Sequence, residues 1–212
     1  TIKWEAVPWG TCQDKVINLA IAGDPVDLAY VGSRTLKGLA ENGHIINVDI
    51  PQSQIDMYQP GILNTVSHLG KVWGYPRAFS TKALFMNCDL LDQAGVACEG
   101  PETWDELYSM AEAVTNNVPG VAGIGLTGKD FDNTMHQFLN YLYSNGGQVI
   151  DPDTNTITLN SSNTVEALAF YGKLANVAQE GPLAYERSQL RDLLNDKKIA
   201  MYIDGPWGRG TH

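Results

Sequence analysis

The sequence predicts an α/β protein with two lobes, and three observations lead to this expectation. Strand-like and helix-like segments alternate in an early stretch of the chain, and a second alternation follows later. Residues 70–91 join the two stretches and contain extended runs on both sides of Pro76. Proline fixes its own φ and favours extended geometry in the residue before it. We therefore expect one lobe over residues 1–77, another over residues 78–212, and a hinge ribbon joining them.

Composition limits the possible functions. The chain has 212 residues, of which 43% are hydrophobic and 18% are charged, so a packed core is expected rather than disorder. Its net charge is −10, which argues against binding to nucleic acids or anionic membranes. No apolar run reaches the roughly 18–20 residues of a membrane span, so no transmembrane segment is expected. Because Thr1 is not a natural start and no targeting segment follows, we expect a mature or truncated piece.

The chain has three cysteines, Cys12, Cys88 and Cys98, which are too few for a disulfide framework. Their spacing matches no metal-binding motif. The favoured interpretation is three free, mostly buried thiols. The alternative is a bond between Cys88 and Cys98, which flank one short helix, in an oxidising compartment.

Four elements are expected before residue 45: strands at 2–7 and 26–31, and helices at 11–22 and 34–41. The first strand alternates apolar and polar residues, and the second is a short apolar run typical of a buried parallel strand. Thr11 and Ser33 are the expected helix caps. Together these elements form a βαβα unit. In a unit of this kind the loops that follow the strands carry ligand groups, and here these loops are residues 8–13 and 31–34.

Further elements are expected along the rest of the chain. Strands are expected at 45–49, 121–126, 148–150, 156–158 and 198–203. Short broken helices are expected at 51–68, a short helix at 89–94, and further helices at 132–144 and 187–195. Thr103 and Glu106 form a capping box that should begin one further helix. Asn163 and Glu166 form a second possible box, for a helix that ends near Gly181.

Several local patterns occur in a fixed order along the chain: GDPVDLAYVGS at 23–33, GKVWGYP at 70–76, FMNCDLL at 85–91, PETWDEL at 101–107, NGG at 145–147 and KIAMYIDGPW at 198–207. In this order they resemble the extracellular solute-binding proteins of ABC transporters, in the sugar-binding branch similar to maltose-binding protein. The resemblance implies a periplasmic-binding-protein-like fold of two α/β lobes, a carbohydrate ligand in an interlobe cleft, and delivery to permease subunits. It also implies no catalysis, no cofactor, and a periplasmic or lipid-anchored cell-surface location.

The chain departs from that family at both ends. By this comparison it lacks the first strand–helix unit and the last third to half of the protein. The first lobe is then incomplete, and its exposed strand edges favour self-association. We expect such a fragment to bind its ligand weakly or not at all.

The expected ligand contacts combine an aromatic ring for the apolar sugar face with short polar groups for the hydroxyls. Trp207 is the leading candidate, because Gly205 and Pro206 fix the turn that projects its ring, although a core or rim position would explain it as well. By the resemblance, Trp207 matches the stacking tryptophan of this turn, and Ser80 matches a polar contact. His136 and Gln137 lie where maltodextrin binders have a ligand-contacting aromatic; an exposed helix histidine is the alternative for His136.

The remaining candidates come from the first lobe and the ribbon. They are Gly32, Ser33 and Arg34 at a helix start, Arg77 on the ribbon, and Trp9 and Gln13 on the first loop. Backbone N–H groups at a helix start are free to bind a ligand. For Ser33 a plain capping role is the alternative, and Arg77 could instead pair with an acid or extend over apolar surface.

Enzyme readings have weaker support. Residues 123–128 match G-x-G-x-x-G, but a dinucleotide site needs that loop to lead directly into a helix, and three residues intervene. No hydrolase or P-loop motif is present, and no pair of carboxylates stands out for glycosidase chemistry. We expect no catalytic residue and no metal. The alternatives left open are a carbohydrate-active or nucleotide-dependent enzyme and a truncated structural or interaction module.

Overall fold

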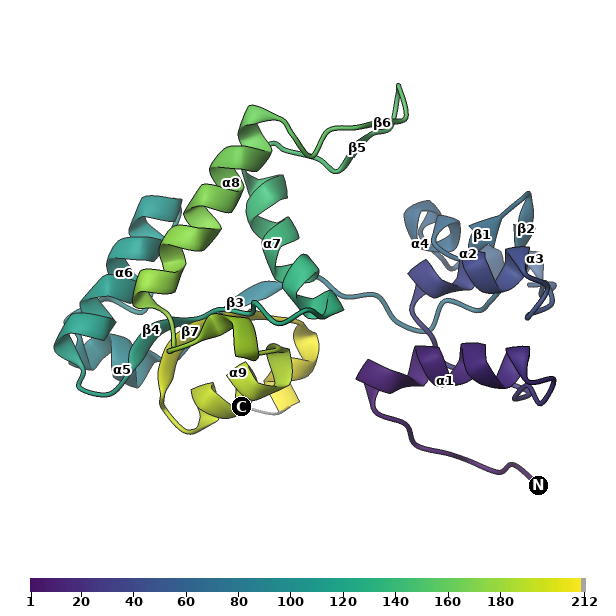
Figure 1. The fold of residues 1–212 in the computed structure, drawn as a ribbon, viewed down its shortest axis with the longest axis horizontal. Helices are drawn as coiled ribbons and strands as arrows, with labels where there is room; N and C mark the ends of the chain where they lie inside the picture. Colours follow the sequence, from purple (N-terminus) through teal and green to yellow (C-terminus); the bar gives the residue numbers. More distant parts are fainter. Residues whose placement is uncertain (211–212) are drawn as a thin grey trace. The chain divides into compact units, whose positions relative to one another are not determined.

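The structure is a computed structural model that describes residues 1–210. The chain divides into two compact units, the first covering Thr1–Phe79 and the second beginning at Ser80. Each unit has its own helices and strands (Figure 1). Among the described residues, no helix is both long and apolar enough to cross a bilayer.

The first unit is mainly helical. Its elements are α1 (Trp9–Ile21), α2 (Ser33–Glu41), α3 (Gln52–Ile55), α4 (Pro60–Asn64), β1 (Ser67–His68) and β2 (Lys71–Val72). The two strands form an antiparallel hairpin in which His68 is opposite Lys71. Leu69 and Gly70 make its turn with φ of 51° and 72°, as a tight two-residue hairpin requires. Buried apolar side chains come from α2 and the segments after it: Leu36, Leu39, Ala40, Ile50 and Val66.

The prediction of two strands early in the chain is wrong. Residues 2–7 and 26–31 have no regular structure, and their apolar side chains lie in solvent, with Ile2 91% and Leu28 94% exposed. Alternating β-prone residues favour a strand only where a neighbouring strand accepts the hydrogen bonds. Among the described residues neither segment pairs with one. Residues 45–49 are not a strand either, although Val48 N donates to Val72 O at 2.9 Å.

Both expected caps in the first unit are also wrong. The helix α1 begins at Trp9 with Pro8 in the capping position, and the Thr11 hydroxyl donates back to the Pro8 carbonyl. In α2 the capping position belongs to Gly32, so Ser33 is already the first helical residue. A glycine is acceptable there because the position needs extended backbone rather than a particular side chain.

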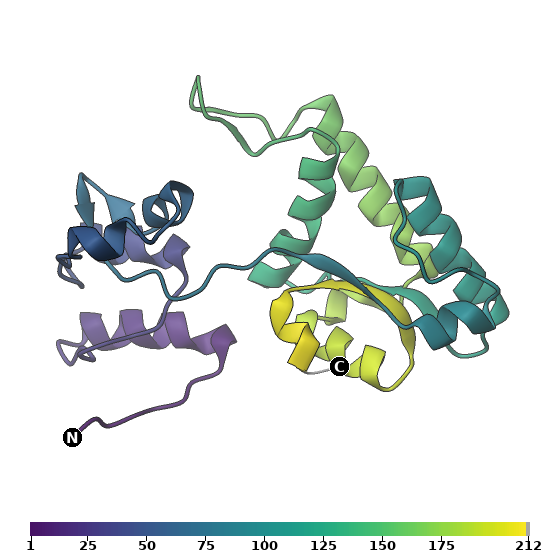
Figure 2. The ribbon, with the colours of Figure 1, turned by 180° about the vertical axis from the view of Figure 1, so that it is seen from behind.

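The second unit is built on a three-stranded sheet in the order β3-β7-β4. Its central strand β7 runs antiparallel to β3 and parallel to β4. The helix α9 lies against one face of the sheet, while α6, α7 and α8 lie on the other side (Figures 1 and 2). The strands are β3 (Ala83–Met86), β4 (Ala122–Gly125), β7 (Ile199–Asp204) and the small hairpin β5 (Ile150–Asp151) and β6 (Thr156–Ile157).

Most helices of the second unit follow the sequence expectation. They are α5 (Cys88–Gln93), α6 (Trp104–Asn117), α7 (Asp132–Ser144), α8 (Ser162–Lys173) and α9 (Arg187–Asn195), with short 3-10 turns η1 (Leu174–Val177), η2 (Pro182–Ala184) and η3 (Pro206–Gly210). The Thr103–Glu106 capping box is confirmed. The Asn163–Glu166 box is wrong, because Ser161 caps α8 by accepting from Thr164 N, and this helix ends at Lys173.

The sheet buries apolar side chains on two sides. The larger cluster joins strands and helices around residues such as Leu91, Ala111, Ile124, Leu174 and Met201, and within it Trp104 stacks on Phe170 with ring centres 4.6 Å apart. The smaller cluster places α9 against β7 through Leu190, Leu194, Ile199 and Tyr202. β7 is therefore covered on both faces, as its continuous apolar sequence predicts.

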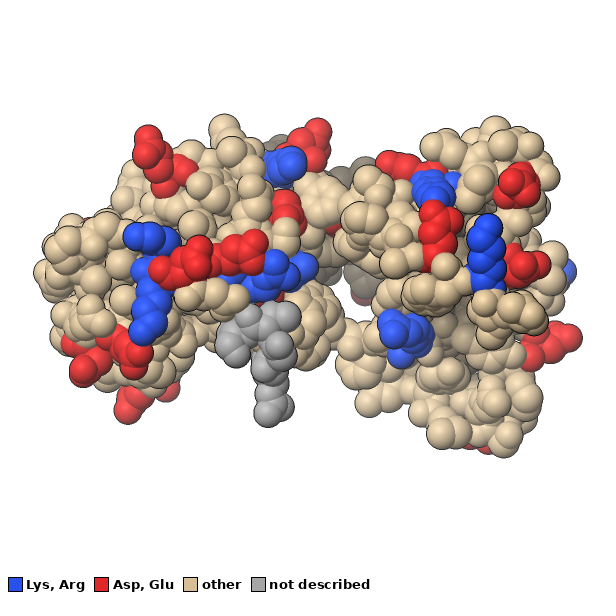
Figure 3. Space-filling view, turned by 90° about the horizontal axis from the view of Figure 1, so that it is seen from below, with Lys and Arg blue, Asp and Glu red and all other residues tan. Residues whose placement is uncertain are grey.

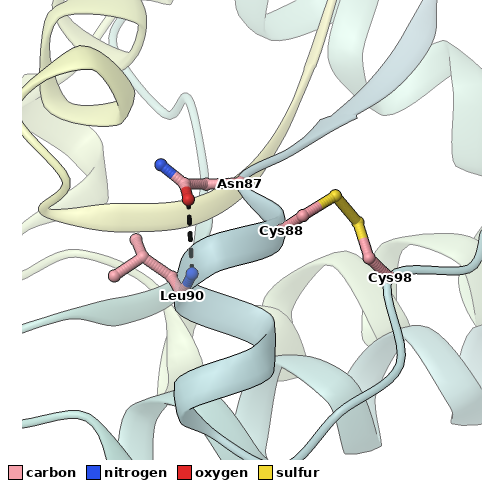
Figure 4. The surroundings of a disulfide bond; sticks show 4 residues. All are labelled: Asn87, Cys88, Leu90 and Cys98. Carbon is pink, nitrogen blue, oxygen red and sulfur yellow. Dashed lines mark hydrogen bonds between the residues drawn. A yellow bond between two sulfur atoms is a disulfide. The ribbon is translucent and has the colours of Figure 1, made fainter.

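Cys88 and Cys98 form a disulfide, so the favoured interpretation of three free thiols is wrong (Figure 4). Cys88 is the first residue of α5, and Asn87 caps this helix by accepting from Leu90 N at 3.2 Å. Cys98 lies in the loop after the helix, with Cα atoms 5.2 Å apart across the bond. The bond ties the loop to the start of α5. Cys12, in α1, is a free thiol.

Breaking this bond should destabilise the second unit. The two cysteines are 10 residues apart in sequence, and the chain-entropy estimate for so short a loop is about 3 kcal/mol. Urea unfolding of the Cys88→Ser/Cys98→Ser variant should therefore show a lower free energy of unfolding than the oxidised protein. The Cys12→Ser variant is the control and should unfold like the parent. Identical unfolding curves for all three proteins would show that the bond carries no stability.

Candidate functional site

The strand register of the second unit brings Lys82 to Trp207. Ala83 pairs with Asp204 across the antiparallel β3–β7 ladder, so Lys82 lies at the end of β7, where η3 begins. The Lys82 ammonium is 4.5 Å from the centre of the Trp207 ring, and the guanidinium carbon of Arg187 is 5.4 Å from it. Together with Tyr202, these residues are called here the Trp207 cluster: Lys82, Arg187, Tyr202, Asp204 and Trp207.

The carboxylate of Asp204 holds this cluster together. Its side chain is fully buried. Trp207 Nε1 and Gly205 N each donate to Oδ1 at 2.7 Å, and the Tyr202 hydroxyl donates to Oδ2 at 2.5 Å. Arg187 Nη1 lies 3.3 Å from Oδ2 and forms an ion pair with it. A buried carboxylate is tolerated when it is paired and hydrogen-bonded in this way.

Burial changes the protonation of two members of the Trp207 cluster. Burial raises the pKa of Tyr202 well above its usual range, and the hydrogen bond to Asp204 adds to this shift, so the phenol stays a donor. Burial lowers the pKa of Lys82, an effect that the carboxylates of Asp204 and Asp132 partly offset. The cluster thus combines a fixed, neutral phenol with a partly desolvated ammonium.

The backbone at Gly205 lets the Trp207 ring fold back over the chain. A Cβ at Gly205 would lie 2.3 Å from two carbons of that ring, so no other residue fits without moving it. Trp207 is 44% exposed, which places it at the rim of the unit rather than in its core. The ring therefore has a fixed orientation and an accessible surface, as the sequence interpretation of the turn requires.

Ser80 and His136 lie on the segments that lead to this cluster. Ser80 is exposed and precedes Lys82 by two residues. His136 is half-buried on α7, one helical turn after Asp132, the carboxylate that acts on Lys82. Their roles as ligand contacts stay predictions.

Gln137 is used inside the unit. It is 4% exposed, and its Oε1 accepts from Thr127 N at 3.1 Å while its Nε2 donates to Ile203 O at 3.3 Å. The Tyr171 hydroxyl donates to Thr127 O at 2.6 Å, and burial raises the pKa of Tyr171 to about 12, so this donor is kept at neutral pH. These bonds fix the chain just after β4 and connect it to β7. They give Gln137 a structural role that its sequence position did not suggest.

In the first unit, the remaining candidates gather around Tyr30. Trp9 lies 5.8 Å from Tyr30 between ring centres, and the Arg77 guanidinium carbon is 4.7 Å from the Tyr30 ring centre. The Thr35 hydroxyl donates to Gln13 Oε1, which joins the starts of α1 and α2. The group is called here the Tyr30 cluster: Trp9, Gln13, Tyr30, Gly32, Arg34 and Arg77.

Gly32 allows the close approach within the Tyr30 cluster. A Cβ at Gly32 would lie 3.0 Å from Gln13 Oε1 and 3.3 Å from Arg34 Nη1. Tyr30 is 52% exposed and Trp9 is 39% exposed, so the two rings remain accessible. Ser33 is exposed beside this cluster at the first position of α2. The starts of α1 and α2 thus meet at Gln13 and Gly32, although the strands expected before them do not form. The roles of these residues as ligand contacts stay predictions.

The glycines of residues 123–128 allow close packing, of Gly123 against α6, of Gly125 against β7 and of Gly128 against Leu183. A Cβ at Gly123 would lie 1.9 Å from the Ala111 carbonyl oxygen, and one at Gly125 would lie 2.5 Å from Ile199 Cδ1. Both are on β4 rather than on a loop that opens a helix, and α7 does not begin until Asp132. The motif is therefore explained by close helix–strand contact.

Surface shape and charge do not single out a competing site. Lys and Arg are interspersed with Asp and Glu on the face drawn in Figure 3, so no field of one sign covers it. One open hollow of the second unit lies between the start of α6 and the C-terminal half of α8, lined by residues that include Trp104, Phe170 and Lys173. Among the described residues, no group of His, Cys, Asp or Glu is arranged to hold a metal ion.

The sequence matches a family model along nearly its whole length. The model describes the bacterial extracellular solute-binding proteins, and it covers residues 1–211. The chain belongs to this family. Solute-binding proteins of this family are binding proteins rather than enzymes.

Solved structures give the same family assignment. A solute-binding protein of an ABC transporter from Thermotoga lettingae, bound with α-D-tagatose, is 26% identical with a TM-score of 0.83, over 94% of this chain and 53% of that one. The GacH receptor of Streptomyces glaucescens, solved unliganded and with acarbose, is 26% identical with a TM-score of 0.80, over 95% and 51% of the chains. These likenesses show the periplasmic-binding-protein fold expected from the sequence.

A curated relative is the maltodextrin-binding protein of Bacillus subtilis, 26% identical over 199 residues, which are 90% of this chain and 45% of that protein. The chain spans about half the length of the relatives it matches, 51% for one curated protein and 53% for one solved structure. The matched region therefore corresponds to about half of each of these two relatives.

Sequence reasoning missed five residues of the two clusters, among them Tyr202, which was expected only as part of a strand. Tyr30 was counted as part of a buried strand, and Lys82 became visible only with the β3–β7 register. Asp204 stands in the quoted Asp-Gly-Pro-Trp turn, where a carboxylate three residues before a tryptophan is a usable signal. Arg187 is recognisable only from the packing of α9 on β7.

The hydrogen bond that the Trp207 indole donates to Asp204 should fix the orientation of the ring. In the Asp204→Asn variant the acceptor loses its charge, and Arg187 and Tyr202 lose a charged partner. Breaking a buried pair costs about 3–5 kcal/mol, and solvent at Arg187, whose side chain is 23% exposed, should keep the loss near the lower value. NMR should also show faster exchange of the Trp207 indole N–H with solvent. The signal of this group is assigned by its disappearance in the Trp207→Phe variant. The matched control is Asp192→Asn, an exposed ion-pair change on α9; equal exchange in both variants would contradict this role of Asp204.

Proposed function

We propose that the protein containing this chain binds a mono- or oligosaccharide as the extracytoplasmic solute-binding component of an ABC importer, without catalysing a reaction on it. The observation that carries the proposal is the Trp207 ring, accessible at the rim of the second unit and held by the buried Asp204 carboxylate. Membership of the solute-binding family supports it, as do the sugar ligands bound in two similar structures.

Both clusters have the chemistry that carbohydrates require. A sugar presents an apolar C–H face that packs on an aromatic ring, and hydroxyls that need oriented donors and acceptors. The Trp207 cluster offers the indole face with cations beside it. The Tyr30 cluster offers two partly exposed rings with Gln13 and two arginines. Aromatic rings fixed before binding reduce the entropy lost when a ligand binds.

The proposed mechanism is hinge closure. The two units are joined through residues 76–80. A solute that contacts residues of both units favours the arrangement in which both sets of contacts are made, by its differential affinity for that arrangement. The closed, loaded protein is then the form that the permease subunits receive.

The proposed location is the periplasm or the cell surface, through a lipid anchor on the whole protein. The Cys88–Cys98 disulfide supports a compartment outside the cytoplasm, because such bonds persist in oxidising surroundings. The family description as extracellular agrees with this location.

Removing the indole should weaken carbohydrate binding. We expect Trp207→Ala, made in the protein at its natural length, to lower the affinity for its sugar at least about tenfold, because the stacking surface is lost. Isothermal titration against a panel of mono- and oligosaccharides measures this change. The matched control is Trp4→Ala, since Trp4 is 83% exposed and lies in an irregular segment outside both clusters.

Two results would reject the proposal. One is tight binding of an amino acid, peptide or metal with no response to any carbohydrate. The other is turnover of a bound glycoside, detected as released sugar. The 212-residue chain titrated in parallel should bind the same sugar more weakly than the natural-length protein, since each missing hydrogen bond costs about 1 kcal/mol.

A further inference from the structure

Lys82 is an ammonium that has a ring beside it but no carboxylate partner. Its side chain is half-buried, with Nζ 4.5 Å from the centre of the Trp207 ring. It takes part in none of the ion pairs between the described side chains, which join Lys15 to Glu5, His68 to Glu41, Arg187 to Asp204, Arg191 to Asp192 and Lys197 to Asp89. A cation–π contact is a weaker partner than a carboxylate for a partly desolvated ammonium.

The acids near Lys82 do not supply that partner. Asp204 is buried and already accepts from Tyr202, Gly205, Trp207 and Arg187. Asp132 acts on Lys82 electrostatically without being its ion-pair partner. Burial lowers the pKa of Lys82 and the nearby Arg187 charge adds to this shift, which the two carboxylates offset only in part.

The position of Lys82 over the ring makes it sensitive to the charge of a stacked ligand. A neutral sugar that packs on this face of Trp207 displaces the ammonium and returns nothing for the lost cation–π contact. A sugar that carries a carboxylate offers the displaced ammonium an ion pair next to the ring. Charge-assisted hydrogen bonds of this kind are roughly twice as strong as neutral ones.

The Tyr30 cluster of the first unit also combines an aromatic ring with a cation beside it. Arg77 stands over the Tyr30 ring, and Arg34 lies against Gly32. The chain has only 14 Lys and Arg residues against 24 acids, yet the two clusters contain Lys82, Arg187, Arg34 and Arg77. The planar fork of an arginine matches the two oxygens of a carboxylate.

We propose that the ligand is an acidic carbohydrate, a uronic acid or an oligosaccharide that contains one, and that Lys82 pairs with its carboxylate beside the Trp207 ring. This inference rests on the proposed function and adds to it the charge class of the sugar. Lys82 acts as a specificity-determining residue: it discriminates between sugars of the same ring shape that differ in oxidation at one carbon.

The test uses the natural-length protein and matched probes. Isothermal titration compares D-galacturonate with D-galactose, D-glucuronate with D-glucose, and acidic oligosaccharides from pectin, alginate and hyaluronan with neutral ones from galactan, arabinan and starch. The acidic member should bind at least about tenfold more tightly, as expected for one charged hydrogen bond. Its affinity should fall as salt is raised, whereas that of a neutral sugar should not.

Lys82→Met removes the charge and keeps most of the side-chain length. It should abolish the preference for the acidic probe, because no charge remains to pair with the carboxylate of the sugar. The matched control is Lys173→Met, because Lys173 makes a similar contact with the Tyr108 ring at 4.1 Å, outside both clusters. The control should keep the preference.

The outcomes separate this inference from the proposed function. Binding of neutral sugars with no acidic probe preferred overturns the inference and leaves the proposed function in place. A preference that survives in Lys82→Met overturns the role of Lys82. Absence of binding by every carbohydrate rejects the proposed function, and the inference with it.

Discussion

The buried carboxylate of Asp204 is the constraint on which the candidate site depends. It lies at the end of the central strand, and its hydrogen bonds reach the Tyr202 phenol, the backbone of Gly205, the Trp207 indole and, through an ion pair, the start of α9 at Arg187. An unpaired charge in that position would destabilise the folded state by roughly several kcal/mol. The carboxylate and its hydrogen-bond donors must therefore stay in place together. The same interaction therefore completes the fold of the second unit and orients its exposed ring.

Local chemistry explains which elements the sequence could predict. The range of α9 follows from its helical pattern, and the Thr103–Glu106 box follows from two side chains three residues apart. β7 follows from one continuous apolar run. In contrast, residues 2–7 and 26–31 have β-prone patterns and no strand, because the pairing that would make them strands depends on a distant neighbour. The pattern gave a preference, and tertiary context decided the outcome.

The same distinction applies to the candidate site. The turn that carries Trp207 was predictable because Gly205 and Pro206 restrict it. Residues 9–13 and 33–34, expected in loops after strands, instead belong to α1 and α2. Lys82 was not predictable, because its contact with the indole results from the β3–β7 register. Gln137 was expected as a ligand contact from the family resemblance, and the sequence did not reveal that its amide is bonded inside the unit.

A family fold gives no sugar specificity by itself; that specificity must come from how rings and charges are placed. The most direct test of the role of Trp207 is to follow its indole N–H by NMR while the natural-length protein is titrated with the carbohydrate that calorimetry identifies. The Trp207 signal should move and saturate with the calorimetric affinity, while the Trp104 indole, which donates to Ser144 Oγ at 3.1 Å, should stay in place. Saturable carbohydrate binding that leaves the Trp207 signal unmoved would place the ligand elsewhere in the protein.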